Sequence, residues 1–417
     1  MYGGEEMEPV NATIDTGCCI VGGGPAGMML GFLLARAGVD VVVLEKHADF
    51  LRDFRGDTIH PSTLELIHEL GLLEEFLRHP HQEVRELAGQ VGNEVFKVAD
   101  FTHLPTHCKF LALMPQWDFL NFMVEQGGRY PRFRVTMQAQ ATDLIEQNGR
   151  IIGATARTSN GVMEVRAKLT VGADGRHSIV RDRAGLQVTD LGAPMDVLWM
   201  RISRRPSDPG RSLGHVEPGR MFIMIDREDY WQCAFLIPKG AADEIRKRGI
   251  EQFRADIGNL EPVLRDRVSE LRDWNDVSLL TVRVDRLTRW WRPGLLCIGD
   301  AAHAMSPVGG VGINLAIQDA VAAANILAAK LAAGSPRDQD LRAVQRRRQF
   351  PTRATQRLQV LIQNSVISRI LSSSRPVAVP WPLKLMQQWP WLRRIPARMI
   401  GIGFRPEHVR TPEEPRR

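Results

Sequence analysis

A glycine-rich turn between two apolar runs restricts the fold more than any other stretch of the chain. Residues 18–47 read CCIVGGGPAGMMLGFLLARAGVDVVVLEKH. The apolar run at 18–21 predicts a buried strand, the run at 28–36 a helix, and the β-branched run at 39–44 a second strand. The turn carries the GxGxxG spacing at Gly22, Gly24 and Gly27. This order of elements is typical of a unit that binds the phosphates of a dinucleotide.

Each glycine of the turn has its own physical role. The first permits the tight turn, the second lets a pyrophosphate approach the backbone, and the third lets the helix pack closely on the strand. The helix N-terminus offers N–H groups to phosphate, and an acid that ends the second strand can accept hydrogen bonds from ribose hydroxyls. The motif does not separate FAD from NAD, and a glycine-rich turn in an unrelated parallel sheet is the alternative. The cofactor-binding residues predicted here are Gly22, Gly24, Pro25, Ala26, Gly27, Glu45 and Lys46.

Size and composition indicate a folded protein with more than one domain. A chain of 417 residues exceeds one typical core, and 44% hydrophobic with 24% charged residues is a globular composition. The net charge of +6 is mild, and the arginine cluster at 346–348 is typical of a solvated helix face. We therefore expect no nucleic-acid binding, although a basic surface suits the attraction of an anionic cosubstrate.

Cysteine usage and hydropathy indicate the cellular setting. The five cysteines form neither a disulfide framework nor a metal-binding pattern, so we expect no metal site and a reducing, cytoplasmic location. The short polar N-terminus has no signal-peptide pattern. Residues 18–44 are apolar but contain Arg36 and the glycines, and no other stretch reaches the roughly 20 apolar residues that a spanning helix needs. The sequence thus predicts no transmembrane segment.

Two further glycine–acid motifs follow the first. Residues 171–181 read VGADGRHSIVR, and residues 297–320 read CIGDAAHAMSPVGGVGINLAIQDA. Together with GGGPAG and Glu45, they resemble the single-component (class A) FAD-dependent aromatic monooxygenases related to para-hydroxybenzoate hydroxylase. The resemblance covers roughly residues 15–345 and extends to close relatives such as flavin halogenases and ubiquinone-pathway hydroxylases.

The resemblance and the patterning together predict an α/β fold in three parts. These are a Rossmann-like FAD-binding domain with a parallel sheet, an inserted antiparallel β-sheet domain that binds substrate, and a helical, basic C-terminal region. Residues 1–16 are expected to form a loose leader. The predicted boundaries are 15–75, 114–185 and 286–345 for the FAD-binding domain, 76–113 and 186–285 for the substrate domain, and 346–417 for the extension.

The resemblance also implies cofactor contacts outside the first motif. In the family, the acid of the third motif, here Asp300, holds the ribitol chain, and the glycine loop after it passes close to the flavin ring. The helix that follows presents its N-terminal N–H groups to negative charge on the reduced flavin. Asp174 could instead cap a helix, Arg55 could be a surface arginine, and Gln116 a polar loop residue. The residues implied in this way are Arg55, Gln116, Asp174, Asp300, Gly312, Ile313 and Asn314.

The implied reaction uses FAD, NAD(P)H and O2. NAD(P)H reduces FAD, oxygen adds at the flavin C4a atom, and the resulting hydroperoxide transfers one oxygen to an electron-rich substrate. The protein positions the substrate and excludes water. No second GxGxxG appears, which fits a family in which the nicotinamide cosubstrate binds transiently to a groove.

Three residues are predicted to be catalytic. His215 falls roughly where the family places a tyrosine that deprotonates a phenol, and a histidine pKa suits a base; an ordinary surface histidine is the alternative. Asp57 belongs to the loop near the flavin, where Thr58 and His60 are alternatives, and Pro307 belongs to the glycine loop of the third motif.

The predicted substrate is an aromatic or polyketide-like, largely apolar small molecule. Where benzoate hydroxylases carry serine and arginine for a carboxylate, this chain has FIMI at 222–225. Most apolar residues of the inserted sheet are expected to be core, with some lining a pocket: Trp199, Met200, Met221, Phe222, Met224, Trp231 and Phe235.

Other functions stay open from the sequence. A flavin halogenase would carry a WxWxIP element, but the run YWQCAFLIP at 230–238 lacks the second tryptophan. A flavin dehydrogenase or a prenyl-lipid reductase at a membrane would suit the basic, tryptophan-rich tail, and a flavoprotein without chemistry could serve as a binding module. The tail either rests peripherally on a membrane or packs over the flavin domain, and the protein is a monomer or a homodimer.

Overall fold

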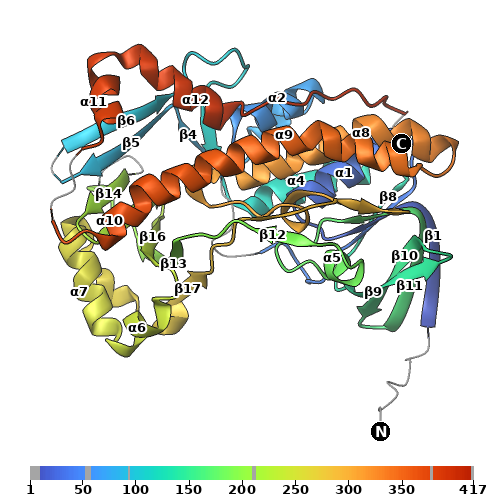
Figure 1. Ribbon diagram of the computed structural model, residues 1–417, viewed down its shortest axis with the longest axis horizontal. Helices are drawn as coiled ribbons and strands as arrows, with labels where there is room; N and C mark the ends of the chain where they lie inside the picture. Colours follow the sequence, from blue (N-terminus) through green and yellow to red (C-terminus); the bar gives the residue numbers. More distant parts are fainter. Residues whose placement is uncertain (1–9, 52–57, 93, 209–212, 376–378, 415–417) are drawn as a thin grey trace, which may run out of the picture.

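The computed structural model shows a layered α/β molecule in which a long helix crosses both of its halves (Figure 1). Arg55 and Asp57, two of the predicted site residues, lie outside the residues that the structure describes. The described residues are 10–51, 58–92, 94–208, 213–375 and 379–414.

The first layer is a mainly parallel sheet that carries the glycine turn. Its strand order is β19-β20-β11-β1-β2-β8, and the antiparallel pair β9–β10 is attached to β11. The pairs β1–β11, β1–β2, β2–β8 and β11–β20 are parallel. The strands are β1 (Val10–Val21), β2 (Val41–Leu44), β8 (Phe133–Thr136), β9 (Gln140–Gln147), β10 (Arg150–Thr158), β11 (Gly161–Gly172), β19 (Trp291–Arg292) and β20 (Leu295–Cys297).

The expectation of a loose leader is wrong for residues 10–16. They extend β1 and pair with β11, with Val10 opposite Val162 and Thr16 opposite Ala167. Most of the side chains at 11–17 are exposed, so backbone hydrogen bonds to the long partner strand hold this segment. Hydrophobic patterning does not reveal a strand that is held in this way.

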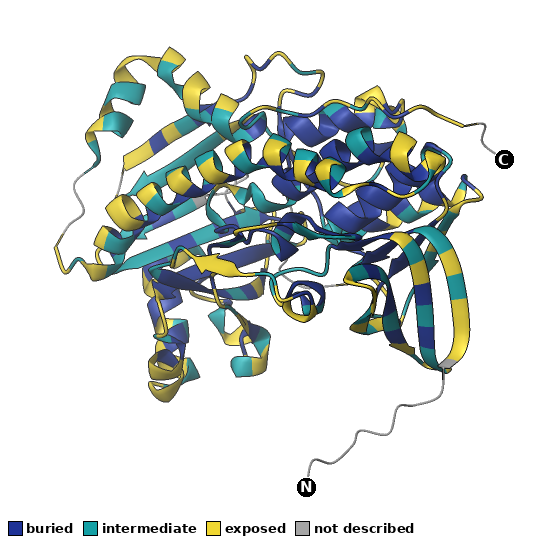
Figure 2. Cartoon of the chain, turned by 45° about the vertical axis from the view of Figure 1, so that its right-hand side comes forward, coloured by how far each residue is buried: buried dark blue, intermediate teal, exposed yellow. Residues whose placement is uncertain are grey.

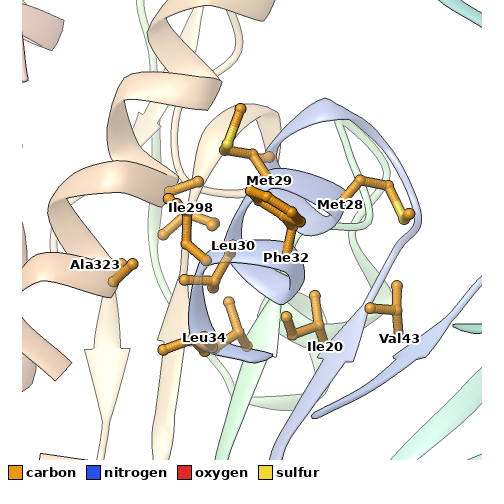
Figure 3. Close-up of a cluster of buried hydrophobic side chains, with 14 of the residues drawn as sticks. Ile20, Met28, Met29, Leu30, Phe32, Leu34, Val43, Ile298 and Ala323 are labelled. Carbon is orange, nitrogen blue, oxygen red and sulfur yellow. The ribbon is translucent and has the colours of Figure 1, made fainter. Parts of the chain in front are cut away.

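Helices cover the parallel sheet and bury the nucleotide-binding unit. The helix α1 (Pro25–Arg36) packs against α4 (Gln116–Gly128) and α8 (Gly312–Ala333). It is buried along most of its length because its apolar residues lie on every face. Figure 3 shows its side chains among those of the sheet and of α8, with Ile20, Met28, Met29, Leu30, Phe32, Leu34, Val43, Ile298 and Ala323 labelled.

The expectation that no stretch beyond 18–44 is long and apolar enough to cross a membrane is wrong for segment 308–333, which includes α8 and is the one helix among the described residues that meets this test. Within the fold, 67% of its most apolar window is buried. It packs between α1 and α9 (Asp338–Ile362), and its buried residues include Ala316, Ala320, Ala323 and Ala324, whose small side chains allow close helix approach. The segment therefore has the environment of a core helix.

The second layer is a seven-stranded, mostly antiparallel sheet of order β17-β13-β16-β15-β14-β5-β6. The helices α6 (Ala242–Lys247) and α7 (Ile250–Leu260) cover one face of it (Figure 1). Along β15, fully buried side chains alternate with partly exposed ones, so the opposite face is more open (Figure 2). The strands are β5 (Glu86–Val91), β6 (Glu94–Asp100), β13 (Met195–Ser203), β14 (Leu213–Glu217), β15 (Arg220–Asp226), β16 (Tyr230–Pro238) and β17 (Val277–Leu280).

Small elements connect the two layers. A three-stranded sheet of order β3-β7-β4 and a two-stranded sheet β12–β18 join segments that are far apart in the sequence. These elements are β3 (Thr58–Ile59), β4 (Gln82–Val84), β7 (Leu111–Leu113), β12 (Val188–Asp190), β18 (Asp285–Leu287), and the helices α2 (Pro61–Glu69), α3 (Leu73–Phe76) and α5 (Ile179–Arg183).

The C-terminal part spans the whole molecule. The helix α9 leads through a π-helical turn into α10 (Ser368–Ser372), and α11 (Trp381–Gln388) and α12 (Arg394–Gly401) then pack on β6 (Figure 1). The last described residues return to the first layer, where the Arg36 guanidinium donates to the Thr411 carbonyl at 2.8 Å. The tail thus contacts both layers.

A buried ionic network links this C-terminal part to the third motif. The Asp319 carboxylate on α8 accepts from Arg348 Nε at 2.9 Å and lies 2.5 Å from His303 Nε2, and Arg348 also donates to Glu407 at 3.2 Å. Asp319 and Arg348 are both 0% exposed. Although burial disfavours ionisation, His303 and Arg348 hold the pKa of Asp319 below its ordinary value. The expectation that residues 346–348 form a solvated helix face is therefore wrong for Arg348.

We predict that Arg348→Met lowers the free energy of unfolding by about 3 kcal/mol, because it removes the guanidinium partner of the buried Asp319 carboxylate and one of the two arginines that pair with Glu407. The matched control is Arg346→Met, two residues earlier on the same helix, where the side chain is exposed and a change of less than about 0.5 kcal/mol is expected. Urea unfolding followed by circular dichroism measures both. Equal losses in the two variants would show that the network contributes nothing beyond helix packing.

Candidate functional site

The glycine turn is closely packed at two positions and open at one. A Cβ atom on Gly22 would lie 2.4 Å from the Ala173 carbonyl oxygen, and one on Gly27 would lie 2.0 Å from the Gly22 carbonyl oxygen. A Cβ on Gly24 would meet no atom within 4 Å. Gly24 is also the N-cap of α1, which has no side-chain cap, and Pro25 occupies its first turn. The turn therefore leaves space and backbone donors at the place where a phosphate would bind.

Glu45 lies beside this space at the end of β2. Its side chain is buried, Oε2 accepts from the Gly23 N–H at 2.9 Å, and Oε1 accepts from the His47 N–H at 3.1 Å. These contacts fix the carboxylate next to the turn, as a ribose-binding acid requires. Lys46 is exposed, and Ala26 is buried at the start of α1.

Asp174 of the second motif organises its own turn. Its carboxylate accepts from the Ser178 hydroxyl at 2.5 Å and from the Val180 N–H at 3.2 Å, at the start of α5. Burial raises the pKa of Asp174, which these hydrogen bonds oppose. Asp174 therefore supports the N-terminus of α5, whose N-cap is Ser178, and its turn packs directly against Gly22.

Arg176, two residues further on, connects the second and third motifs. Its Nε donates to Asp300 Oδ2 at 3.0 Å and its Nη2 to the Met305 carbonyl at 3.2 Å. Its Nη1 is buried and has no hydrogen-bond partner in the described part of the chain. Arg176 was not identified from the sequence, because the residue types of the motif do not reveal that its side chain reaches Asp300.

The glycine loop of the third motif lies against β3. Pro307 precedes a short turn at Val308–Gly310, in which Gly310 has a φ of +62°. A Cβ atom on Gly310 would lie 3.2 Å from Thr58 Oγ1, so the loop packs closely on β3. Asn314 ties the two segments together: its Nδ2 donates to the Thr58 carbonyl at 3.0 Å, and its Oδ1 accepts from the Thr63 hydroxyl at 2.7 Å.

Two further bonds, from the His60 N–H at 2.9 Å and to the Gly310 carbonyl at 3.4 Å, saturate the Asn314 side chain. Only the backbone at the start of α8 is then left to contact a cofactor. Gly312 and Ile313 form that start and are partly exposed, as is Gln116 at the start of α4.

His60 is buried and faces the same loop. Its Nδ1 lies 2.7 Å from the Ile400 carbonyl, so Nδ1 carries the proton and Nε2 is an acceptor. Burial lowers the pKa of His60 to about 4. Nε2 lies 3.6 Å from the point that a Cβ atom on Gly310 would occupy, and it has no hydrogen-bond partner among the described residues. The ring is thus a neutral hydrogen-bond acceptor beside the loop, held there by α12 of the tail.

His215 lies apart from these residues. It stands opposite Phe222 in the β14–β15 ladder, and directly opposite residues share a face of the sheet. Phe222 packs under α6 and α7, so His215 points to that face, where its Nδ1 lies 3.0 Å from Glu261. This hydrogen bond raises the pKa of His215. The structure does not bring His215 to the loop that carries Pro307.

The other face of the seven-stranded sheet is apolar and lies against this loop. Val308 packs with residues of β13, β15, β16 and β17. Of the aromatic and methionine residues singled out in the sequence, Trp199 and Met221 belong to this face. The remainder belong to the core under α6 and α7: Met200, Phe222, Met224, Trp231 and Phe235.

These features fit FAD. The open position at Gly24 suits the pyrophosphate, the fixed carboxylate of Glu45 suits a ribose, and Asp300 with the unpartnered Arg176 Nη1 offers polar contacts to the chain that links phosphate and ring. The glycine loop packs on the apolar sheet face through Val308. The fold and the site define an FAD-binding flavoprotein.

Comparison with known proteins agrees with this class. Residues 15–358 match the family described as an FAD binding domain. The chain belongs to this family, and it is an FAD-dependent monooxygenase of the aromatic hydroxylase type. It is 32% identical over 403 residues to 6-methylpretetramide 4-monooxygenase of Streptomyces rimosus, which covers 95% of this chain and 94% of that protein. It is 24% identical over 347 residues to para-nitrophenol 4-monooxygenase of Pseudomonas sp. (strain WBC-3), covering 81% and 84%.

Solved structures share the fold. The anhydrotetracycline hydroxylase OxyS of Streptomyces rimosus superposes with a TM-score of 0.72 at 22% identity, covering 93% of this chain and 76% of that one. The myxobacterial chondrochloren halogenase CndH also gives 0.72, at 20% identity, covering 92% and 90%. Because hydroxylases and a halogenase match equally well, the fold alone does not separate them.

We predict that Gly24→Ala and Gly27→Ala fail in different ways. The Gly24 methyl group meets only open space, so the apoprotein keeps its melting temperature while the FAD dissociation constant rises at least about tenfold. The Gly27 methyl group overlaps the Gly22 carbonyl, so this variant is destabilised with or without FAD. Thermal melts with and without added FAD distinguish the two. Unchanged FAD affinity in Gly24→Ala would place the pyrophosphate elsewhere.

We predict that His60 makes the protein less stable in acid. Between the ordinary pKa of 6.5 and about 4, the unfolded chain binds a proton that folded His60 does not, so stability is complete above this window and falls as the pH drops through it. The loss reaches about 3 kcal/mol at pH 4. His60→Gln removes this component of the melting-temperature profile, whereas the exposed control His177→Gln keeps it. Coincident profiles for wild type and His60→Gln would contradict the assignment.

Proposed function

We propose that this enzyme uses FAD, NAD(P)H and O2 to hydroxylate a fused-ring, phenolic, polyketide-like substrate. The observation that carries this proposal is the 32% identity to 6-methylpretetramide 4-monooxygenase along almost the whole of both chains. The apolar sheet face opposite the glycine loop supports it, because a large ring system needs an extended apolar surface and few polar anchors.

Each part of the chain has a role in this reaction. Bound FAD supplies the two-electron reduction and the activation of O2 that side chains cannot provide. The open turn at Gly24, Glu45 and Asp300 hold the cofactor, and the N-terminus of α8 presents N–H groups where negative charge develops.

The apolar face with Trp199, Met221 and Ile223 orients the substrate rings and excludes water. With a pKa of about 4, His60 Nε2 accepts a hydrogen bond at neutral pH but is too weak a base to take up a proton permanently. It is therefore proposed to orient a hydroxyl or N–H donor beside the loop.

Several features predicted from the sequence stay predictions. These include the domain boundaries, the catalytic roles of His215, Asp57 and Pro307, and the cytoplasmic location. The choice between monomer and homodimer also stays open, as does a peripheral membrane contact. The tail does expose large apolar side chains, namely Trp381, Trp389, Trp391 and Ile395.

The test is coupled turnover by the purified yellow holoenzyme. A tetracyclic phenol should accelerate NADPH oxidation and suppress release of hydrogen peroxide, and mass spectrometry with labelled O2 should find one oxygen atom in the product. A single-ring benzoate, 4-hydroxybenzoate, should do neither, because the described side chains that pack with Val308 on this face are apolar and offer no partner for a carboxylate. A product formed only with added chloride or bromide would favour the halogenase, and FAD-bound protein that does not oxidise NAD(P)H would disprove the proposal.

A further inference from the structure

A cavity of about 440 Å³ opens on the surface where α9 crosses the two-stranded sheet β12–β18. Its polar wall consists of two arginines and two amides, Arg286, Gln356, Arg357 and Asn364. Its apolar wall consists of Leu191, Val360 and Leu361. No carboxylate lines it, and no Asp or Glu occurs in the sequence between Asp340 and Glu407. The function derived above from the cofactor site does not use this cavity.

The arginines at this cavity lack acidic partners. Arg353 lies one turn before Arg357 on α9, so the two share a helix face. Among the described residues, no carboxylate lies within 4.0 Å of the guanidinium groups of Arg286, Arg353 or Arg357, whereas Arg347 and Arg348 of the same helix both pair with Glu407. Within the described part of the chain, the Arg286 side chain donates one hydrogen bond, to Gln356 Oε1 at 3.3 Å.

Burial and the two neighbouring arginines lower the pKa of Arg286. Three like charges held together beside a cavity repel one another, and an anion with several charges would relieve that repulsion.

One residue of the cavity wall contacts the backbone that leads into the glycine loop of the third motif. Gln356, which lines the cavity, donates through Nε2 to the carbonyls of Asp285 at 2.7 Å and Ala304 at 3.1 Å. Gln359, one turn further along α9, donates to the carbonyls of Ser306 at 3.0 Å and Val308 at 2.9 Å. Gln356 and Gln359 thus hold, from the buried face of α9, the backbone that leads into the glycine loop, whereas Arg353 and Arg357 lie on its exposed face.

We infer that this cavity binds the phosphate groups of the nicotinamide cosubstrate. A dinucleotide carries a pyrophosphate, and NADPH carries a 2′-phosphate in addition, which matches a cluster of three unpaired guanidinium groups. The apolar wall offers a surface for a base. This inference rests on the proposed function, because it identifies where the electron donor of that reaction is held.

The test measures binding as well as turnover. NADP⁺, which cannot reduce the enzyme, is titrated calorimetrically into FAD-loaded wild type, Arg286→Gln, Arg357→Gln and the double variant. We expect each single change to raise the dissociation constant about tenfold and the double change to raise it further. The KM for NADPH should rise in parallel at nearly constant kcat, with a weaker salt dependence. The exposed Arg342→Gln on the same helix is the matched control and should behave like wild type.

The effects of the arginine variants on NADPH and on NADH distinguish the possible results. A larger effect on NADPH than on NADH assigns the arginines to the 2′-phosphate, and an equal effect assigns them to the pyrophosphate; both support the inference. Dissociation constants and KM values within twofold of wild type, in variants with unchanged FAD content and melting temperature, would overturn it. Failure of the proposed function looks different, because wild-type holoenzyme would then oxidise neither NADPH nor NADH.

Discussion

The position of the candidate cofactor site depends on the contacts of one buried carboxylate, that of Asp319. It accepts from the Gly299 N–H at 3.1 Å, lies against His303, and is neutralised by Arg348. These partners come from the third motif and from α9, and Asp319 itself lies on α8. One fully buried charge therefore fixes the backbone that presents Asp300, the helix whose N-terminus closes the cofactor site, and the helix that crosses both layers. A buried charge is tolerated only with such complete pairing, so the three segments cannot shift independently.

The nucleotide-binding unit could be predicted from the sequence because its rules are local. The backbone conformation at Gly22 and the close packing at Gly27 are demanded within a few residues, and the strands on either side are apolar runs. The leader and Arg348 could not be predicted in the same way. Residues 10–16 are held by a partner strand about 150 residues away, and Arg348 is buried because Glu407 and Asp319 surround it. Neither of these long-range contacts can be recognised from the residue pattern of the neighbouring sequence.

The catalytic side of the site shows the same limit in a sharper form. In a strand, a shift of one residue exchanges the faces, so Gly214 and His215 lie on opposite sides of the sheet. The sequence can therefore place His215 on a strand of the substrate sheet, but it cannot tell which face of that sheet the side chain occupies. The orientation of the His60 ring depends on the Ile400 carbonyl, 340 residues further along the chain, which binds Nδ1 and leaves Nε2 toward the loop. Arg176 likewise depends on a contact with a distant motif.

The two proposals place ligands of opposite character on different surfaces around the glycine loop. The apolar sheet face packs on Val308 from one layer, while Gln359 of α9 holds the Val308 carbonyl from the other side. A charged dinucleotide would lose hydration without compensation on the apolar face, and a fused-ring phenol would gain little from unpaired guanidinium groups. Both ligands must nevertheless reach the same flavin ring. The glycine loop is fixed for this by the side-chain amides of Gln359 and Asn314, which donate to the Val308 and Gly310 carbonyls, while the Val308 side chain packs on the apolar sheet face.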